Sequence, residues 1–211
     1  MDNYTYTIPE NEHQSYIFIF DNIAARDIIL SFYVKRNATL AVQFFACANF
    51  TFTMHCILEE EGASSSIIGT CIMHSTNKIS VKTIQHHHAH HTTSTVNVKG
   101  VLYDSAHIDY HGTIRVEEGV KNISASQENK NIMMGNNTRA VSIPTLQILS
   151  NEVQCFHASA TGMLDEKQLF YLTSRGIDNN SAKNLLIQAF LMELNFNDTI
   201  KKEIAKKLGI L

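Results

Sequence analysis

The ten residues HIDYHGTIRV, positions 107–116, alternate between two kinds of side chain. The apolar or small residues of this stretch are Ile108, Tyr110, Gly112, Ile114 and Val116. Each residue between them is polar or charged. Successive side chains of a β-strand point to opposite faces, so the stretch predicts a strand with one buried face.

Similar runs of β-branched and aromatic residues recur roughly every 10 to 15 residues, from about Tyr16 to about Ala158. They include SYIFIF, DIILSFYVK, TLAVQFFA, FTFTMHCIL, KISVKTIQ, STVNVKGVLY, HIDYHGTIRV, VKNISASQ, VSIPTLQIL and EVQCFHAS. No helical segment between them is long enough for a βαβ crossover. The pattern predicts an all-β body, and a sandwich, a jelly roll and a β-helix all fit it.

Glycine and proline are scarce, with nine and two residues respectively. Sandwiches and barrels built on tight two-residue hairpins need more of both. Asn and Ser dominate the breaks between the runs. This composition favours a β-helix, in which each coil stacks on the last at about 4.8 Å and buries an apolar ladder. We expect residues 1–160 to form this core.

The hydrophobic period changes to a helical one after Gly162, and residues 161–211 are predicted to be a C-terminal helical segment. The stretch 164–176 has acids in its first turn, Arg175 in its last and Gly176 at the position that follows a helix. A second helix, with a cap among residues 178–181, would bury one stripe, consisting of Ala182, Leu185, Leu186, Ala189, Phe190 and Leu194. A third would run from about Asp198 to Leu208 with Ile200, Ile204 and Leu208 on its apolar side. We expect the three helices to cover an open end of the β body.

The composition is that of an ordinary soluble protein, large enough for one domain, with 211 residues, 18% charged residues and a formal net charge of -3. It is not basic enough to favour nucleic acid. No apolar run approaches the roughly 18 residues of a membrane span. The first residues lack the features of a signal peptide, which predicts a cytoplasmic protein with its four cysteines reduced.

Five histidines crowd into HHHAHH, residues 86–91. On a strand, His86, His88 and His90 would project from one face and His87 and His91 from the other. Neutral imidazoles in such a row bind transition metals such as zinc, copper, nickel or iron. The alternative is an exposed polar turn or an internal polar network, because the run has no acidic or thiol partner close in sequence.

Cys155 and His157 are separated by one residue on a predicted strand, which places both side chains on the same face. A thiolate and an imidazole favour zinc or the iron of a cluster, and a thiol beside an imidazolium can also be an activated nucleophile. The alternative is a buried cysteine beside a surface histidine. Glu117 and Glu118 are adjacent, so they would point to opposite faces and make a poor acid/base pair. No GxSxG, HExxH, P-loop or GxGxxG motif occurs.

Four segments, taken in order, resemble the C-terminal core of the SufB/SufD family, the paired scaffold subunits of the SUF iron-sulfur cluster assembly system. The segments are HHHAHHTTSTVNVKGVLYDSAHIDYHGTI, SASQENKNIMMG, SIPTLQI and VQCFHASATGMLDEKQLFYLTSRGI, within about residues 75 to 195. The positions that carry the resemblance are His88, His91, Lys99 to Leu102, Asp104, Gly112, Ile114, Gln127, Asn129, Asn131, Pro144, Leu146, Ile148, Cys155, His157, Gly162, and Leu169 to Ile177.

The resemblance implies a right-handed parallel β-helix followed by helices. Family members pair edge to edge through their β-helices, and their C-terminal helices dock the ABC-type ATPase SufC. Cys155 and His157 would then face the interface where a nascent iron-sulfur cluster is transiently held. The residues expected to meet the ATPase are Leu169, Phe170, Tyr171, Arg175 and Gly176.

The chain resembles the SufD type more than the SufB type. SufB-type subunits have a cysteine where this chain has Asn129, and an acid where it has Ala158. The function implied is a non-enzymatic SufD-like scaffold that pairs with a SufB-like subunit, or with itself, and with a SufC-like ATPase. Full-length members carry a further N-terminal domain and a longer β-helix.

A jelly-roll, cupin-like metalloenzyme is the alternative. The row from His86 to His91 would bind one metal together with His107 or His111 and leave a coordination position open. This alternative predicts antiparallel strands.

Overall fold

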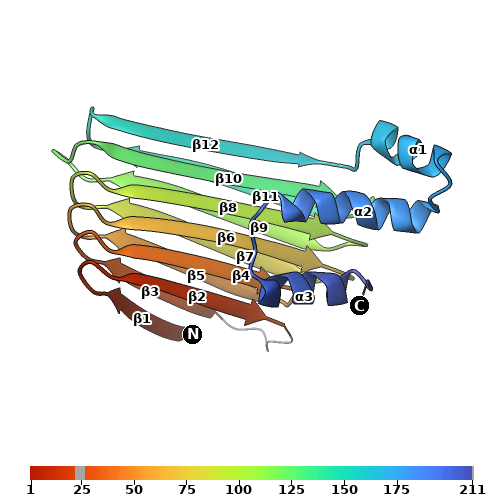
Figure 1. Cartoon of the computed structure of the whole chain (residues 1–211), viewed down its shortest axis with the longest axis horizontal. Helices are drawn as coiled ribbons and strands as arrows, with labels where there is room; N and C mark the ends of the chain where they lie inside the picture. Colours follow the sequence, from red (N-terminus) through yellow and green to blue (C-terminus); the bar gives the residue numbers. More distant parts are fainter. Residues whose placement is uncertain (22–26, 211) are drawn as a thin grey trace.

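The structure, a computed structural model, describes residues 1–21 and 27–210. Within those residues the chain forms twelve strands followed by three helices (Figure 1). The strands are β1 (Asp2–Ile8), β2 (His13–Phe20), β3 (Asp27–Val34), β4 (Thr39–Ala46), β5 (Phe50–Leu58), β6 (Ser64–Met73), β7 (Lys78–His87), β8 (Thr93–Leu102), β9 (His107–Val116), β10 (Ile123–Met133), β11 (Arg139–Ile148) and β12 (Val153–Gly162). The helices are α1 (Glu166–Ser174), α2 (Asn179–Met192) and α3 (Asp198–Lys207).

The strands alternate between two six-stranded sheets, one in the order β1-β3-β5-β7-β9-β11 and the other β2-β4-β6-β8-β10-β12. Every strand pairing in the described residues is parallel. The even strands cross the near side of Figure 1 to the right, and the chain returns behind them as it rises, which is right-handed coiling. The predicted parallel β-helix is therefore confirmed, and the jelly roll, which needs antiparallel strands, is wrong.

Asparagine takes over the turn role that glycine has in tighter folds. Asn11, Asn37 and Asn122 all adopt a left-handed backbone conformation, with φ of 60°, 51° and 57°. Each lies in the turn from an odd strand to the next even strand. Asn tolerates this conformation better than other residues with a side chain. The coils therefore turn without many glycines, which explains the composition that favoured a β-helix.

Strands β1 and β6 have no counterpart among the predicted runs. Ser64, Ser65 and Ser66 look like a break in the sequence, yet they pair in register with β4 and β8. The predicted run VKNISASQ continues as β10 to Met133. β6 and β10 pair with a strand on either side, and β1 pairs with β3 on one side. This pairing holds the stretches in extended form, whatever their intrinsic preference.

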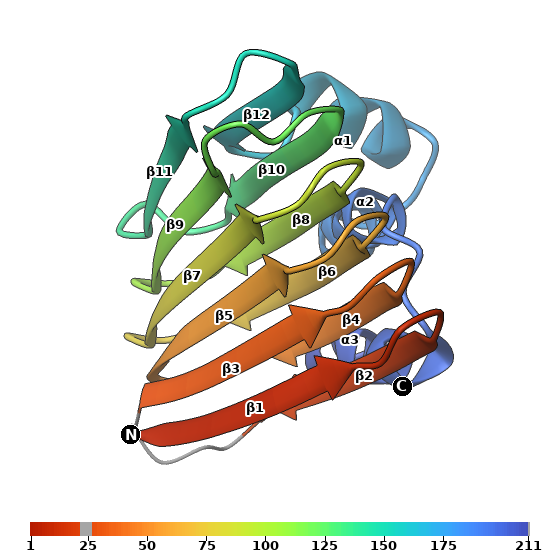
Figure 2. The ribbon, with the colours of Figure 1, turned by 90° about the vertical axis from the view of Figure 1, so that its left-hand side faces the viewer.

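The two sheets face each other along the β-helix (Figure 2). The space between them is apolar in the first coils and mixes apolar with polar side chains in the later ones. Phe32, Phe44 and Phe52 are fully buried, and the rings of Phe44 and Phe52 meet edge to face. The alternation of HIDYHGTIRV is confirmed, since its five even-numbered residues are all buried. In the later coils the interior holds polar side chains, consisting of Thr83, Gln85, Gln127, Asn129 and Asn131.

Helices α2 and α3 pack on the outer face of the even-strand sheet, so the expectation that they cover an open end of the β body is wrong. Their apolar residues share one cluster with Phe45, Ile72 and Val101 on β4, β6 and β8. Ile200, Ile204 and Leu208 of α3 are buried as predicted. No helix of the described chain is long and apolar enough to cross a membrane.

The predicted apolar stripe of α2 is only partly correct. Ala182 and Leu194 are buried, but the other buried positions are Ile187 and Leu191, while Leu185 is 45% exposed. The helix is rotated from the predicted stripe because it rests on the flank of a sheet and also packs against α1. The cap is Asp178, whose side chain accepts from the backbone of Asn180 and Ser181.

Lys99, on β8, ties α2 to the sheet. Its ammonium donates to the backbone oxygen of Phe190 and to Glu193 Oε2, each at 2.5 Å, and lies 4.4 Å from the centre of the Phe190 ring. The side chain of Lys99 is only 3% exposed. Because the charge is nearly buried, these contacts fix where the end of α2 lies.

Candidate functional site

Cys155 and His157 lie on β12, the last strand of the even-strand sheet. They pair in register with Ala125 and Gln127 of β10. Ala125 and Gln127 are buried between the sheets, so Cys155 and His157 lie on the same inward side. The hydrogen bond from Asn131 to Thr161, two pairs further along, shows that the odd-numbered residues of β12 continue on this side.

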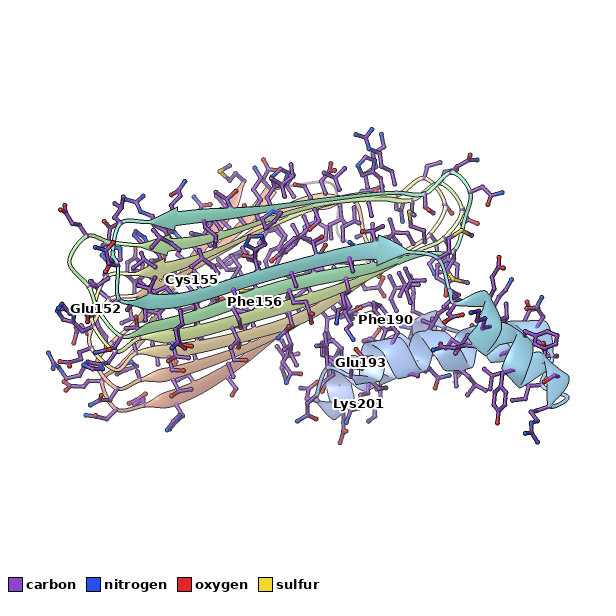
Figure 3. All side chains as sticks on the ribbon, turned by 90° about the horizontal axis from the view of Figure 1, so that it is seen from above. Glu152, Cys155, Phe156, Phe190, Glu193 and Lys201 are labelled. Carbon is purple, nitrogen blue, oxygen red and sulfur yellow. The ribbon has the colours of Figure 1, made fainter. Side chains whose placement is uncertain are left out.

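The two side chains differ in exposure. Cys155 is half-buried and packs against the small cluster of Ile114, Val116, Val120, Ile123 and Ala125. His157 is exposed, because β12 has a hydrogen-bonded neighbour on one edge only. Figure 3, from above, shows Cys155 and Phe156 on the outermost strand, directly open to the viewer. A thiol and an imidazole thus lie on the inward side of the last strand, at the uncovered end of the β-helix.

Burial raises the pKa of the Cys155 thiol. A raised pKa keeps the sulfur protonated at neutral pH, which argues against an activated nucleophile, since the thiolate is the reactive form. It leaves the role of metal ligand open, because a bound metal itself removes the proton. Among the described residues, no third Cys, His, Asp or Glu completes a close cluster with this pair.

Polar side chains line the interior below the pair. Asn129 donates to the backbone oxygen of Val98 and accepts from Asn131. Gln85 and Gln127 have buried polar atoms that lack a hydrogen-bond partner among the described residues. Asn129 thus faces the interior, one coil from His157.

The histidine run is split by the end of its strand. β7 ends at His87, whose ring is buried and bonds the hydroxyls of Thr92 and Ser94 at 2.7 and 2.8 Å. Burial lowers the pKa of His87 to about 4, so it is a neutral part of the core. His90 lies in the turn and accepts from the backbone of Lys121. His90 is therefore separate from the row that was expected to include it.

His86 and His88 do come together, and Glu117 joins them from the residue just after β9. His86 lies 2.6 Å from Glu117 and 3.0 Å from His88. Burial lowers the pKa of His86, while its hydrogen bond lowers the pKa of Glu117. The sequence analysis did not place Glu117 near His88, because the two residues are one whole coil apart in the chain. The signal that could have found it is the offset of 29 residues between paired residues of β7 and β9, such as Lys78 and His107.

His107 and His111 cannot join that cluster. They pair with Lys78 and Lys82 of β7, eight and four residues before His86. At about 3.3 Å per residue these offsets correspond to roughly 26 and 13 Å. His107 instead bonds Asp109 at 2.9 Å.

The residues expected to meet a partner lie on or just after α1. Phe170 and Tyr171 are 74% and 58% exposed, Arg175 and Gly176 are exposed, and Leu169 is half-buried. The Arg175 guanidinium stacks over the Tyr171 ring at 5.3 Å. Gly176 has a φ of 88°, as expected for the residue that ends a helix. No residue of α1 is buried.

These features define a mainly β protein, a parallel β-helix with a cysteine and a histidine on its last strand and an exposed helix beside it. Residues 28–190 match the family model described as "SUF system FeS cluster assembly, SufBD core domain". The chain belongs to the SufBD family, whose members serve iron-sulfur cluster assembly.

Curated relatives agree with this assignment. The chain is 24% identical to the iron-sulfur cluster assembly protein SufD of Escherichia coli over 98% of its own length and 50% of that protein. It is 37% identical to a SufBD family protein of Mycobacterium leprae over 51% of its length and 30% of the relative, and 37% identical to SufD of Bacillus subtilis over 44% and 21%. The chain thus spans half or less of the length of these relatives.

Proposed function

We propose that this chain is a SufD-like scaffold subunit that helps to assemble a nascent iron-sulfur cluster. The observation that carries the proposal is the placement of Cys155 and His157 on one face of the terminal strand, where no further strand covers them. Thiolate and imidazole are ligands that iron accepts in clusters. The cluster is cargo, held between this subunit and a second one and then passed on.

The second subunit would be a SufB-like chain or another copy of this one, docked against the end of the β-helix. Strands β11 and β12 each leave one edge unpaired, and such edges invite pairing with another chain. Ile143, Leu149 and Phe156 of this last coil are 44%, 60% and 61% exposed. A partner that covers them would also supply the ligands that Cys155 and His157 lack.

A SufC-like ATPase would dock on α1. The exposed rings of Phe170 and Tyr171 are suited to a partner surface, because aromatic residues dominate the energetics of interfaces. Beside them Lys167, Gln168, Tyr171, Leu172 and Leu186 line an apolar groove of about 350 Å³ between α1 and α2. Movement of the ATPase would reach β8 through α2 and Lys99, and would thereby open or close the end of the β-helix.

The test uses this chain co-expressed with a SufB-like subunit and a SufC-like ATPase, and measures cluster assembly from iron and sulfide without oxygen. His157→Ala should leave the fold and the complex intact and reduce cluster absorption at least about tenfold. His13→Ala removes an exposed histidine at the other end of the β-helix and is the matched control. Equal assembly in the two variants would contradict the proposed site.

Docking is tested in the same complex by Phe170→Ala combined with Tyr171→Ala. We expect loss of the ATPase on co-purification, with no change in the thermal unfolding of the isolated chain. Leu185→Ala, which truncates an exposed apolar residue on α2, is the control and should retain the ATPase. Retention of the ATPase by the α1 variant would rule out this docking surface.

A further inference from the structure

We propose a second metal site, formed by His86, His88 and Glu117, which takes one divalent first-row transition metal such as zinc or iron(II). The site goes beyond the scaffold function and does not depend on it. Two imidazoles and one carboxylate form a ligand set that catalytic zinc and non-haem iron(II) sites use. A single chain supplies all three groups.

The three groups are assembled by the register of the β-helix. His86 is the last residue but one of β7, and His88 follows the strand. The backbone N–H of Glu117 donates to the oxygen of His87, which continues the pairing of β7 with β9 by one step. Glu117 therefore sits one coil from His88, and an ion bound here would join two successive coils.

The distances fit one ion. His88 Nε2 lies 3.0 Å from His86 Nδ1, and Glu117 Oε1 lies 2.6 Å from His86 Nε2. All three ligand atoms lie within 4.8 Å of one another. Ligands at about 2.0 to 2.2 Å from one zinc ion stand roughly 3.3 Å apart. His86 contacts His88 and Glu117 through different ring nitrogens, so the Glu117 carboxylate would turn from Nε2 toward the ion for all three groups to bind it.

The ring protons of His86 and His88 can also be accounted for when a metal binds. Glu117 is a carboxylate and accepts from His86 Nε2–H, which leaves His86 Nδ1 as the acceptor from His88 Nε2–H. A metal would take the place of the His88 Nε2 proton, and that ring, in its other neutral tautomer, would carry the proton on Nδ1. His86 Nδ1 already presents its lone pair. Binding thus replaces two hydrogen bonds, the one between the two rings and the one from His86 to Glu117, by three bonds to the ion.

Neighbouring groups hold the three side chains in place and affect how tightly they would bind a metal ion. The ring of His55, on β5, stacks on His86 with centroids 5.8 Å apart and planes 7° apart, and its Nε2 is buried without a hydrogen-bond partner among the described residues. Arg115 donates to Glu117 through Nε and Nη2 at 3.0 and 2.9 Å. Its positive charge opposes a bound cation and competes for the carboxylate.

This site is distinct from the Cys155 and His157 pair. His86 and His88 belong to the coil of β7 and β8, whereas Cys155 and His157 lie on β12, two places further along the even-strand sheet. The ligand chemistry differs as well, because a thiolate enters one site and not the other. A spectroscopic probe that detects metal–thiolate bonds can therefore tell metal bound at one site from metal bound at the other.

The experiment titrates cobalt(II) into the full, untagged chain and records visible absorption and the thermal midpoint. We expect one equivalent to bind, with ligand-field bands but no thiolate charge-transfer band, and to raise the midpoint by mass action. Cys155→Ala should bind equally well. His88→Ala and Glu117→Gln should bind at least about tenfold more weakly.

Two further variants sharpen the result. His90→Ala is the matched control from the same turn and should bind like the parent chain. Arg115→Gln should bind about threefold or more tightly, because it removes the competing positive charge. Absence of binding, loss of binding in Cys155→Ala, or full binding in His88→Ala would each overturn the site.

Discussion

Lys99 and Glu193 form an ion pair whose two ends lie in different surroundings. The ammonium of Lys99 is 3% exposed and the carboxylate of Glu193 63% exposed, although their charged atoms are 2.5 Å apart. A buried charge that loses its partner is costly, whereas an exposed one is resolvated by water. The two ends of the pair are therefore not equivalent.

Loss of Glu193 should destabilise the chain more than loss of Lys99. Glu193→Ala leaves the buried ammonium without a charged partner, with the carbonyl and ring of Phe190 still beside it, and should lower the free energy of unfolding by about 1 to 3 kcal/mol. Lys99→Met keeps the apolar stem and frees an exposed carboxylate, so it should cost about 1 kcal/mol or less. Urea unfolding of both variants measures the order, and a larger loss in Lys99→Met would contradict this account.

The same pair predicts a pH dependence. The hydrogen bond from Lys99 holds the pKa of Glu193 below its usual range. A carboxyl whose folded pKa is depressed stabilises the fold above its unfolded pKa, about 4.3, and this contribution is lost as the pH falls through the folded pKa. Between about pH 6 and pH 3 the parent chain should lose more stability than Glu193→Gln. Parallel stability profiles would show that the pair does not titrate in this way.

A glycine on β6 makes room for an aromatic ring on β4. Gly69 pairs in register with Phe44, and a Cβ at Gly69 would lie 2.1 Å from that ring. Gly69→Ala should therefore destabilise the chain by about 1 to 3 kcal/mol through overpacking. Gly162→Ala is the control, since a Cβ there would meet nothing within 4 Å and its φ is not positive. Thermal unfolding compares the two, and equal midpoints would contradict the close approach.

The β-helix could be predicted because its signals are local. Alternation within HIDYHGTIRV and the scarcity of glycine and proline are visible in any one coil. The helix caps are local as well, and Asp178 and Gly176 were found where the sequence placed them. Contacts between residues of neighbouring coils could not be predicted in the same way, because they depend on the length of each coil.

The coils vary in length, and this variation hid the contacts between them. Paired residues are 24 apart between Asp27 and Thr51, and 32 apart between His107 and Arg139. No fixed period therefore shows in the sequence, and Glu117 could not be matched to His88. The face of α2 was misjudged for a related reason, since the flank of the even-strand sheet on which Ile187 and Leu191 pack is formed by residues far away in sequence.

The four thiols should differ in reactivity. Burial raises the pKa of Cys47 to about 11 and that of Cys56 and Cys71 to about 12, and these three side chains are buried. Cys155 is half-buried at the open end of the β-helix. A chromogenic disulfide reagent should therefore modify one thiol in the folded chain and four after denaturation. Cys155→Ser should remove the single native reaction; if the reaction persists, the end of the β-helix does not expose this thiol.

Helix α1 should be the least protected helix of the chain. It has no buried residue, whereas α2 and α3 each bury residues in the cluster on the even-strand sheet. Elements with few buried apolar contacts open at low free energy, so their amides exchange with solvent sooner. Hydrogen exchange followed by mass spectrometry should show peptides from residues 166–174 exchanging faster than peptides from α2. If α1 docks a partner through Phe170 and Tyr171, the complex should slow α1 selectively, and equal protection of both helices in the free chain would contradict its loose attachment.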